Sequence, residues 1–189
     1  MAKQLREPSA ALYPAPVVLV TCADAAGKAN VFTVVCVGIA CGKPPMIGIG
    51  VHPWLYSHSL IEATAEFVVN IPTAALVEKV AYCGSTSGRE VDKFKGAGLT
   101  PLPASKVKPP LIAECPVNLE CVVRQKLPLG AHHLFLGEVV ATHVDDAILD
   151  AEGKVSGEKS NPLAYHYLSR EYWSLGKVVG SYGPKKPSH

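Results

Sequence analysis

Residues 30–45 read NVFTVVCVGIACGKPP, a stretch that is rich in β-branched side chains, carries one charge near its end and closes on two prolines. This composition favours a β-strand from about Asn30 to Ala40, broken by Gly42–Pro45. A half-buried strand alternates apolar with polar residues, and this one barely does. The pattern therefore predicts cover on both faces of the strand, by a second sheet or by a flat apolar ligand.

Further strands are expected on either side of this stretch. The run VVLVTC at residues 17–22 follows two prolines, and residues 24–28 contain Gly27 and are typical of a hairpin turn. The run MIGIGV at residues 46–51 is expected to form the next strand. We expect these three to be consecutive strands of one sheet.

The rest of the chain predicts more strands with short helices between them. Ser57 or Ser59 is a plausible helix N-cap, Pro72 opens a second helix, and Ser87–Glu90 has a capping-box pattern for a third. Strands are predicted at residues 66–71, 111–126 and 132–144.

The predicted strand at residues 111–126 separates into two faces. One face is apolar, whereas the other carries Glu114, Asn118, Glu120 and Arg124. The Pro-rich residues 96–110 just before it show little periodicity. We expect them to form a loop that lies over the surface or over a partner chain.

Many strands interrupted by short helices predict an all-β fold, a Greek-key β-barrel or sandwich. The strands do not alternate with long helices, so a doubly wound parallel sheet is not expected. The sequence shows no obvious linker, and a chain of 189 residues is long enough to bury a sizeable core. We therefore expect one domain over residues 1–189.

Composition restricts the partners and the compartment. The net charge is +2 with scattered basic residues, which gives no nucleic-acid footprint. The uncharged run at residues 29–42 is too short to span a bilayer, and no signal peptide is visible. A cytoplasmic protein is expected, without nucleic-acid or membrane partners. Its six cysteines are then expected to be free thiols, with Cys115 and Cys121 in the core and no metal site.

Common catalytic signatures are absent, so candidate sites come from less stereotyped patterns. A helix beginning near Ser57 would offer backbone N–H groups and hydroxyls to an anion such as a phosphate, with His52 and His58 close by. The alternative is that Ser57 caps the helix and the histidines lie on the surface.

Three further patterns each have a functional and a structural interpretation. The strand from Asn30 to Cys36, with polar Asn30 and Thr33, suits the edge of a planar heterocycle or is an ordinary buried strand. Only one of His132 and His133 can serve a given site, because adjacent strand residues point to opposite faces. Arg89 or Lys93 would meet an electron-rich ligand edge and stabilise its negative charge, or both belong to a solvated helix face.

Taken in order, these segments resemble the flavin reductase-like family, which includes flavoredoxin. The segments that carry the resemblance span about residues 13–140 and read YPAPVVLVTC, KANVFTVVCVGIACGKPPMIGIGV, YSHSLIEATAEFVVNIP, CGSTSGREVDKF, CPVNLECVV and GAHHLFLGEVV. The resemblance implies an FMN-binding split β-barrel that usually forms a homodimer. Family members often carry arginine at the position of His52, and tryptophan or serine near Cys36.

The resemblance also implies which residues surround the flavin. The phosphate would lie near Ser57 and His58, with His52 close by, and Lys93 would approach the ring. His132 and Cys36 match positions near the flavin, and His132 is the expected residue for assisting hydride or proton transfer. The implied cofactor-binding residues are Asn30, Phe32, Thr33, Val34, Val35, Cys36, His52, Ser57, His58 and Lys93.

The implied activity is that of an NAD(P)H:flavin reductase, in which a nicotinamide nucleotide passes a hydride to FMN. Electrons would then go to a small-molecule or protein acceptor. The alternative is a flavoredoxin-like electron carrier that holds FMN and is reduced by a partner protein. A non-redox β-barrel binding domain is a third hypothesis, from another class.

Overall fold

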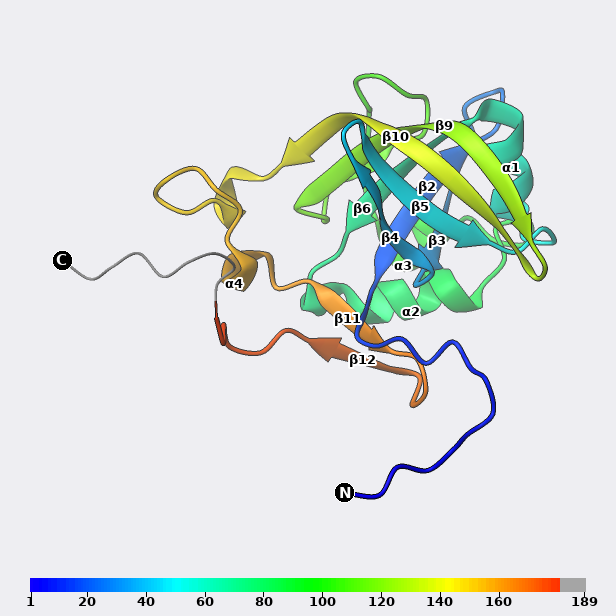
Figure 1. The fold of residues 1–189 in the computed structure, drawn as a ribbon. Helices are drawn as coiled ribbons and strands as arrows, with labels where there is room; N and C mark the ends of the chain where they lie inside the picture. Colours follow the sequence, from blue (N-terminus) through cyan, green and yellow to red (C-terminus); the bar gives the residue numbers. More distant parts are fainter. Residues whose placement is uncertain (181–189) are drawn as a thin grey trace.

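A seven-stranded antiparallel sheet that curls into a barrel dominates the computed structural model, which describes residues 1–180 (Figure 1). The strand order is β3-β2-β6-β9-β10-β5-β4. The strands are β2 (Val18–Ala23), β3 (Ala29–Val34), β4 (Val37–Gly42), β5 (Pro45–Val51), β6 (Glu66–Ile71), β9 (Val117–Leu129) and β10 (His132–Val144). The last nine residues of the expected domain lie outside the described residues.

Short helices and two small sheets surround the barrel. The helices are α1 (Tyr56–Thr64), η1 (Ala74–Leu76), α2 (Val77–Ser85), α3 (Lys93–Ala97), η2 (Asp146–Ile148) and α4 (Gly157–Ser160). The small sheets pair β1 (Ala15–Pro16) with β11 (Leu163–His166) and β12 (Glu171–Ser174), and β7 (Pro101–Leu102) with β8 (Leu111–Ile112). None of the helices within residues 1–180 has the length and apolarity needed to cross a membrane. The predicted all-β barrel with short helices is confirmed.

The stretch from Asn30 to Ala40 is two strands, so the prediction of one strand was wrong. The chain bends at Val35–Cys36, and β3 and β4 lie at opposite ends of the strand order. The backbone N–H of Gly50 donates to the carbonyl of Cys36 at 2.7 Å, which ties the bend to β5. A Cβ at Gly50 would lie 3.0 Å from the Cys36 Cβ, so glycine makes room for this close approach. The bend therefore leads the chain from one end of the strand order to the other, so the three predicted strands belong to one sheet but are not consecutive in it.

A helix covers the second face of β3. Phe32 and Val34 point into the barrel interior, whereas Val31 packs on the other side with Val80 of α2. The Thr33 hydroxyl donates to the Val80 carbonyl at 2.6 Å. In Figure 1, α2 runs beneath the barrel at this position. The expected cover by a second sheet or a flat ligand is thus replaced by α2.

Residues 111–126 also differ from the prediction. Only β8 and β9 are strands, with a turn between them, and two members of the polar face, Asn118 and Glu120, are buried. Glu120 accepts hydrogen bonds from the backbone N–H groups of residues 105–107. The Pro-rich loop therefore lies over the polar face of β9 in its own chain. The cysteines of residues 1–180 are free thiols, and Cys115 and Cys121 are buried, as predicted.

Two predicted helix starts are wrong. Helix α1 begins at Tyr56 after Leu55, without a side-chain cap, so Ser57 lies inside its first turn. Helix α3 begins at Lys93, where Asp92 caps the backbone N–H of Lys95. The predicted capping box at residues 87–90 is a turn instead. The Ser57 hydroxyl is thereby left for tertiary contacts.

Candidate functional site

A cleft opens where β3, the start of α1 and residues 84–93 meet. Two adjoining hollows, of about 340 and 220 Å³, form it. We call it the α1–α3 cleft. The residues common to the walls of both hollows are Asn30, Tyr56, Gly88, Arg89 and Lys93.

Asn30 and Ser57 meet in the wall of this cleft. Both are buried, and the Asn30 Nδ2 donates to the Ser57 Oγ at 2.8 Å. A Cβ at Gly88 would lie 2.1 Å from the Asn30 Oδ1, so only glycine lets the segment pass this close. The local packing therefore fixes the amide and the hydroxyl in one place.

Lys93 brings a buried positive charge to the cleft. Its side chain lies at the start of α3, the residue is 5% exposed, and its Nζ donates to the Cys83 carbonyl at 2.8 Å. Within residues 1–180, no carboxylate lies within 4.0 Å of this ammonium. Burial lowers the pKa of Lys93, against a smaller opposite effect of the Cys83 and Cys22 thiols. Since an ammonium has three donors, donors remain for a ligand in the cleft.

Arg89 supplies a second cation at the outer side of the cleft. Its Nη1 donates to the Trp54 carbonyl at 3.0 Å, and its guanidinium lies 5.5 Å from the centre of the Tyr56 ring. Ser87 contributes a hydroxyl to the same wall. Two cations, hydroxyls and an amide suit an anionic ligand that also carries hydroxyl groups.

The thiols of Cys22 and Cys83, next to the cleft, are unreactive. Burial raises the pKa of Cys22 to about 12, although Ser57 and Asn30 act against it, and raises that of Cys83 to about 11. Both are therefore neutral at physiological pH and serve as packing groups.

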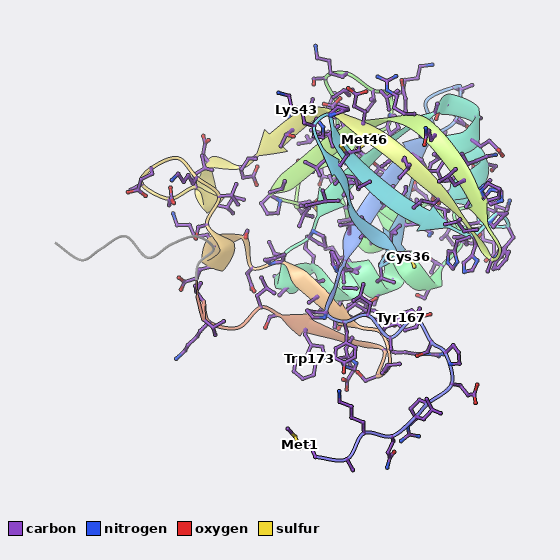
Figure 2. All side chains as sticks on the ribbon, in the orientation of Figure 1. Met1, Cys36, Lys43, Met46, Tyr167 and Trp173 are labelled. Carbon is purple, nitrogen blue, oxygen red and sulfur yellow. The ribbon has the colours of Figure 1, made fainter. Side chains whose placement is uncertain are left out.

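Cys36, His132 and His52 form a second cluster. Cys36 and His132 line an apolar groove on the outside of β4, β5 and β10, and Figure 2 shows Cys36 at the opposite end of β4 from Lys43. Burial, and then the charge of His52, lower the pKa of His132. Burial also raises the pKa of the Cys36 thiol. Trp54 stacks on His52 and lines the cleft, so it joins the two clusters.

His58 is not brought to the cleft, although it follows Ser57 directly. Its ring is buried, and its Nε2 lies 2.8 Å from the His133 Nδ1. Its Nδ1 faces Glu62 at 3.8 Å. Successive residues of a helix point about 100° apart, so Ser57 and His58 cannot share one small site.

The remaining predicted strand residues contribute in different ways. Phe32 and Thr33 line the inner hollow, although the Phe32 ring also belongs to the barrel core. Val34 is buried inside the barrel, and Val35 packs with the cluster under α2. Neither residue lines the α1–α3 cleft.

Sequence reasoning missed several members of the cleft. Trp54 and Tyr56 come just before Ser57 in the sequence, and Gly88 directly precedes Arg89. The aromatic residues just before a helix were the available signal for the first two. The closeness of Gly88 to Asn30 is a tertiary contact that no local pattern reveals.

Comparison with known proteins identifies the family. Residues 10–174 match the family described as flavin reductase like domain. The chain belongs to the flavin reductase-like family. The resemblance predicted from the sequence is thereby confirmed.

Relatives and solved structures of similar sequence support this membership. A protein of Archaeoglobus fulgidus is 35% identical over 145 residues, which cover 77% of this chain and 81% of that protein. The flavoredoxin of Desulfovibrio vulgaris (Miyazaki F) is 29% identical, with a TM-score of 0.91 over 96% of this chain and 97% of that one. The flavoredoxin from Methanosarcina acetivorans is 32% identical, with a TM-score of 0.87 over 96% of each chain.

Proposed function

We propose that this flavin reductase-like protein binds FMN along the α1–α3 cleft and acts as an NAD(P)H:flavin reductase. The observation that carries the proposal is the buried Lys93 ammonium, which has a neutral carbonyl as partner and no carboxylate within 4.0 Å among residues 1–180. A buried charge of this kind is stabilised by an electron-rich ligand. Family membership supports a flavin as that ligand.

The residues of the cleft fit FMN by their chemistry. Arg89 and the hydroxyls of Ser57 and Ser87 suit the phosphate and the ribityl chain, and Lys93 and Asn30 suit the polar edge of the ring. When bound, FMN would supply the redox chemistry, because its ring accepts a hydride from a nicotinamide nucleotide and releases electrons to an acceptor.

The chain's own residues would then position groups and exclude water. The Lys93 ammonium stabilises negative charge at the ring edge, and the Asn30–Ser57 hydrogen bond holds the donors in place. We propose His132 and Cys36 as the catalytic residues. The lowered pKa of His132 favours a neutral imidazole at pH 7 that can accept a proton, and the neutral Cys36 thiol keeps the adjoining groove apolar.

A flavoredoxin-like electron carrier is the second candidate function. It is supported by the similarity to two flavoredoxins, whose sequences are 29% and 32% identical to this chain. Such a carrier would hold FMN in the same cleft and receive electrons from a partner protein instead of NAD(P)H.

We also propose that two copies of the chain associate through the outer face of β4 and the β9–β10 hairpin. Ile39 is 84% exposed there, and Leu129 and Leu127 are also exposed. Burying such side chains against a second copy is favourable. Light scattering on Ile39→Asp, which is expected to give monomers, tests this assembly; dimers of the variant would contradict it.

The visible spectrum of the purified protein with added FMN, followed by NADH and NADPH without oxygen, tests the function. A yellow protein that bleaches promptly with either nucleotide is the expected result for a reductase. Bleaching with dithionite alone would favour the carrier. A protein that binds no FMN would contradict both and return the chain to a non-redox binding role.

A further inference from the structure

We propose that His52 is a positioning residue that fixes the ring of His132 and opposes its protonation. The inference rests on the proposed function, in which His132 is a catalytic residue, and it assigns a separate role to the neighbouring imidazole.

The two rings are in close, tilted contact across the end of the barrel. His52 follows the last residue of β5, His132 is the first residue of β10, and these strands pair with Val51 opposite His133. The ring centres of His52 and His132 are 3.6 Å apart, at an interplanar angle of 34°. Two imidazolium rings at this separation would repel each other, so protonation of one ring disfavours protonation of the other.

A hydrogen bond fixes both the place and the tautomer of His52. Its Nδ1 lies 2.6 Å from the Ala131 carbonyl oxygen. A carbonyl only accepts, so the Nδ1 carries the proton and the Nε2 of the neutral ring is bare. Because Ala131 directly precedes His132, this bond ties His52 to the backbone that carries the neighbouring ring.

The indole ring of Trp54 also packs against the His52 ring. The Trp54 and His52 ring centres are 4.1 Å apart, with an interplanar angle of 22°. Arg89 in turn donates to the Trp54 carbonyl. His52 thus lies between Trp54 at the α1–α3 cleft and His132 at the apolar groove, and its orientation is set from both.

Few charged groups compete with His52 for influence on His132. The groove around His132 presents the Cys36 thiol and the apolar Leu129 and Leu134. In the described part of the chain, no carboxylate lies within 4.0 Å of either ring. Burial contributes most to the lowered pKa of His132 and His52 contributes next, and burial also keeps Cys36 a neutral thiol. Replacing His52 therefore tests the contribution of its charge to the His132 pKa.

The experiment is an NMR titration of the His132 imidazole in the full FMN-free chain, with its signals assigned by their loss in His132→Gln. His52→Gln keeps a donor for the Ala131 carbonyl and removes the titrating ring, whereas His52→Phe keeps an aromatic ring and removes the charge. Both are expected to shift the His132 pKa upward. His52→Arg, with a permanent charge, is expected to shift it downward. His166→Phe, on β11, is the matched control and should leave it unchanged.

An unchanged His132 pKa in His52→Gln and His52→Phe would overturn the proposal, as would an upward shift in His52→Arg. Circular dichroism shows which variants fold, and either neutral variant suffices for the test. Because the titration needs no FMN, its outcome is independent of FMN binding. One further outcome is that FMN fails to bind while the His132 pKa still rises in the neutral His52 variants and falls in His52→Arg. In that case the proposed function fails and the role of His52 beside His132 stands.

Discussion

Glu120 allows a quantitative prediction about the free energy of unfolding, because it is a carboxylate with no exposed surface. One oxygen accepts from the backbone N–H and hydroxyl of Ser105 and lies 2.6 Å from the His143 Nε2. The other accepts from the backbone N–H groups of Lys106 and Val107. Glu120→Gln replaces one acceptor by an NH₂ donor that faces N–H groups. The variant is therefore expected to release the loop from β9.

The size of the effect follows from the pKa of Glu120. Burial acts to raise it, but the hydrogen bonds from Ser105, His143 and Lys106 outweigh burial and lower it from 4.5 to about 2. Each tenfold change in the acid constant is worth about 1.4 kcal/mol, so the charged form contributes about 3 kcal/mol to stability. Since the folded-state pKa is the lower one, this contribution is present above the unfolded value near 4.5 and is lost as the pH falls towards 2.

Urea unfolding followed by circular dichroism at pH 7, 4 and 3 measures this contribution. Glu120→Gln is expected to lose about 3 kcal/mol at pH 7, which lowers the Tm by roughly 6–12 °C for a chain of this size. The difference from the wild type should shrink as the pH falls. Glu138→Gln, which removes a surface pair with Arg124, is the control and should cost less than about 1 kcal/mol. A loss below about 1 kcal/mol for Glu120→Gln, or one independent of pH, would refute the reasoning.

Three other predictions concern the cleft, the barrel and the thiols. Lys93→Met is expected to weaken FMN binding roughly ten- to a hundredfold, because a charge-assisted hydrogen bond is lost. Lys95→Met, on the exposed side of α3, should leave FMN binding unchanged, and fluorescence titration with FMN measures both variants. Gly137→Ala would place a methyl 2.5 Å from an aromatic ring of β6 and should cost about 1–3 kcal/mol in thermal unfolding, unlike Gly38→Ala in open space. Mass spectrometry after brief alkylation of the Ile39→Asp variant, in which the outer face of β4 is expected to be uncovered, should find Cys36 modified and the buried thiols protected. Equal modification of all would contradict the burial.

Local patterns predicted the parts of the fold that depend on neighbouring residues. The strands at residues 66–71 and 132–144 have the predicted limits, because a run of β-prone residues bounded by turn residues specifies a strand by itself. The helix starts near residues 57 and 87–90 were wrong. Capping patterns are common in turns as well, and only packing decides which of them begins a helix.

The candidate site divides in the same way. The sequence alone determined the residue types of the cleft, Asn30, Ser57 and Lys93, and their order along the chain, which is enough to indicate the family. It could not place His58, whose direction depends on the rotation of α1 against the barrel. His52, Ala131 and Trp54 show no joint pattern, because the first two are 79 positions apart.

The sequence by itself determined that this protein is a β-rich chain with a polar, cationic set of residues around the strand at Asn30. Only the tertiary structure decided that this strand ends at Val34, that α2 covers it, and that Glu120 is buried. Propensity acts over a few residues, whereas barrel closure and burial depend on segments that meet from distant parts of the chain. At the bend around Cys36 the chain passes from one end of the strand order to the other, a step that depends on the folded sheet and not on the residues beside it.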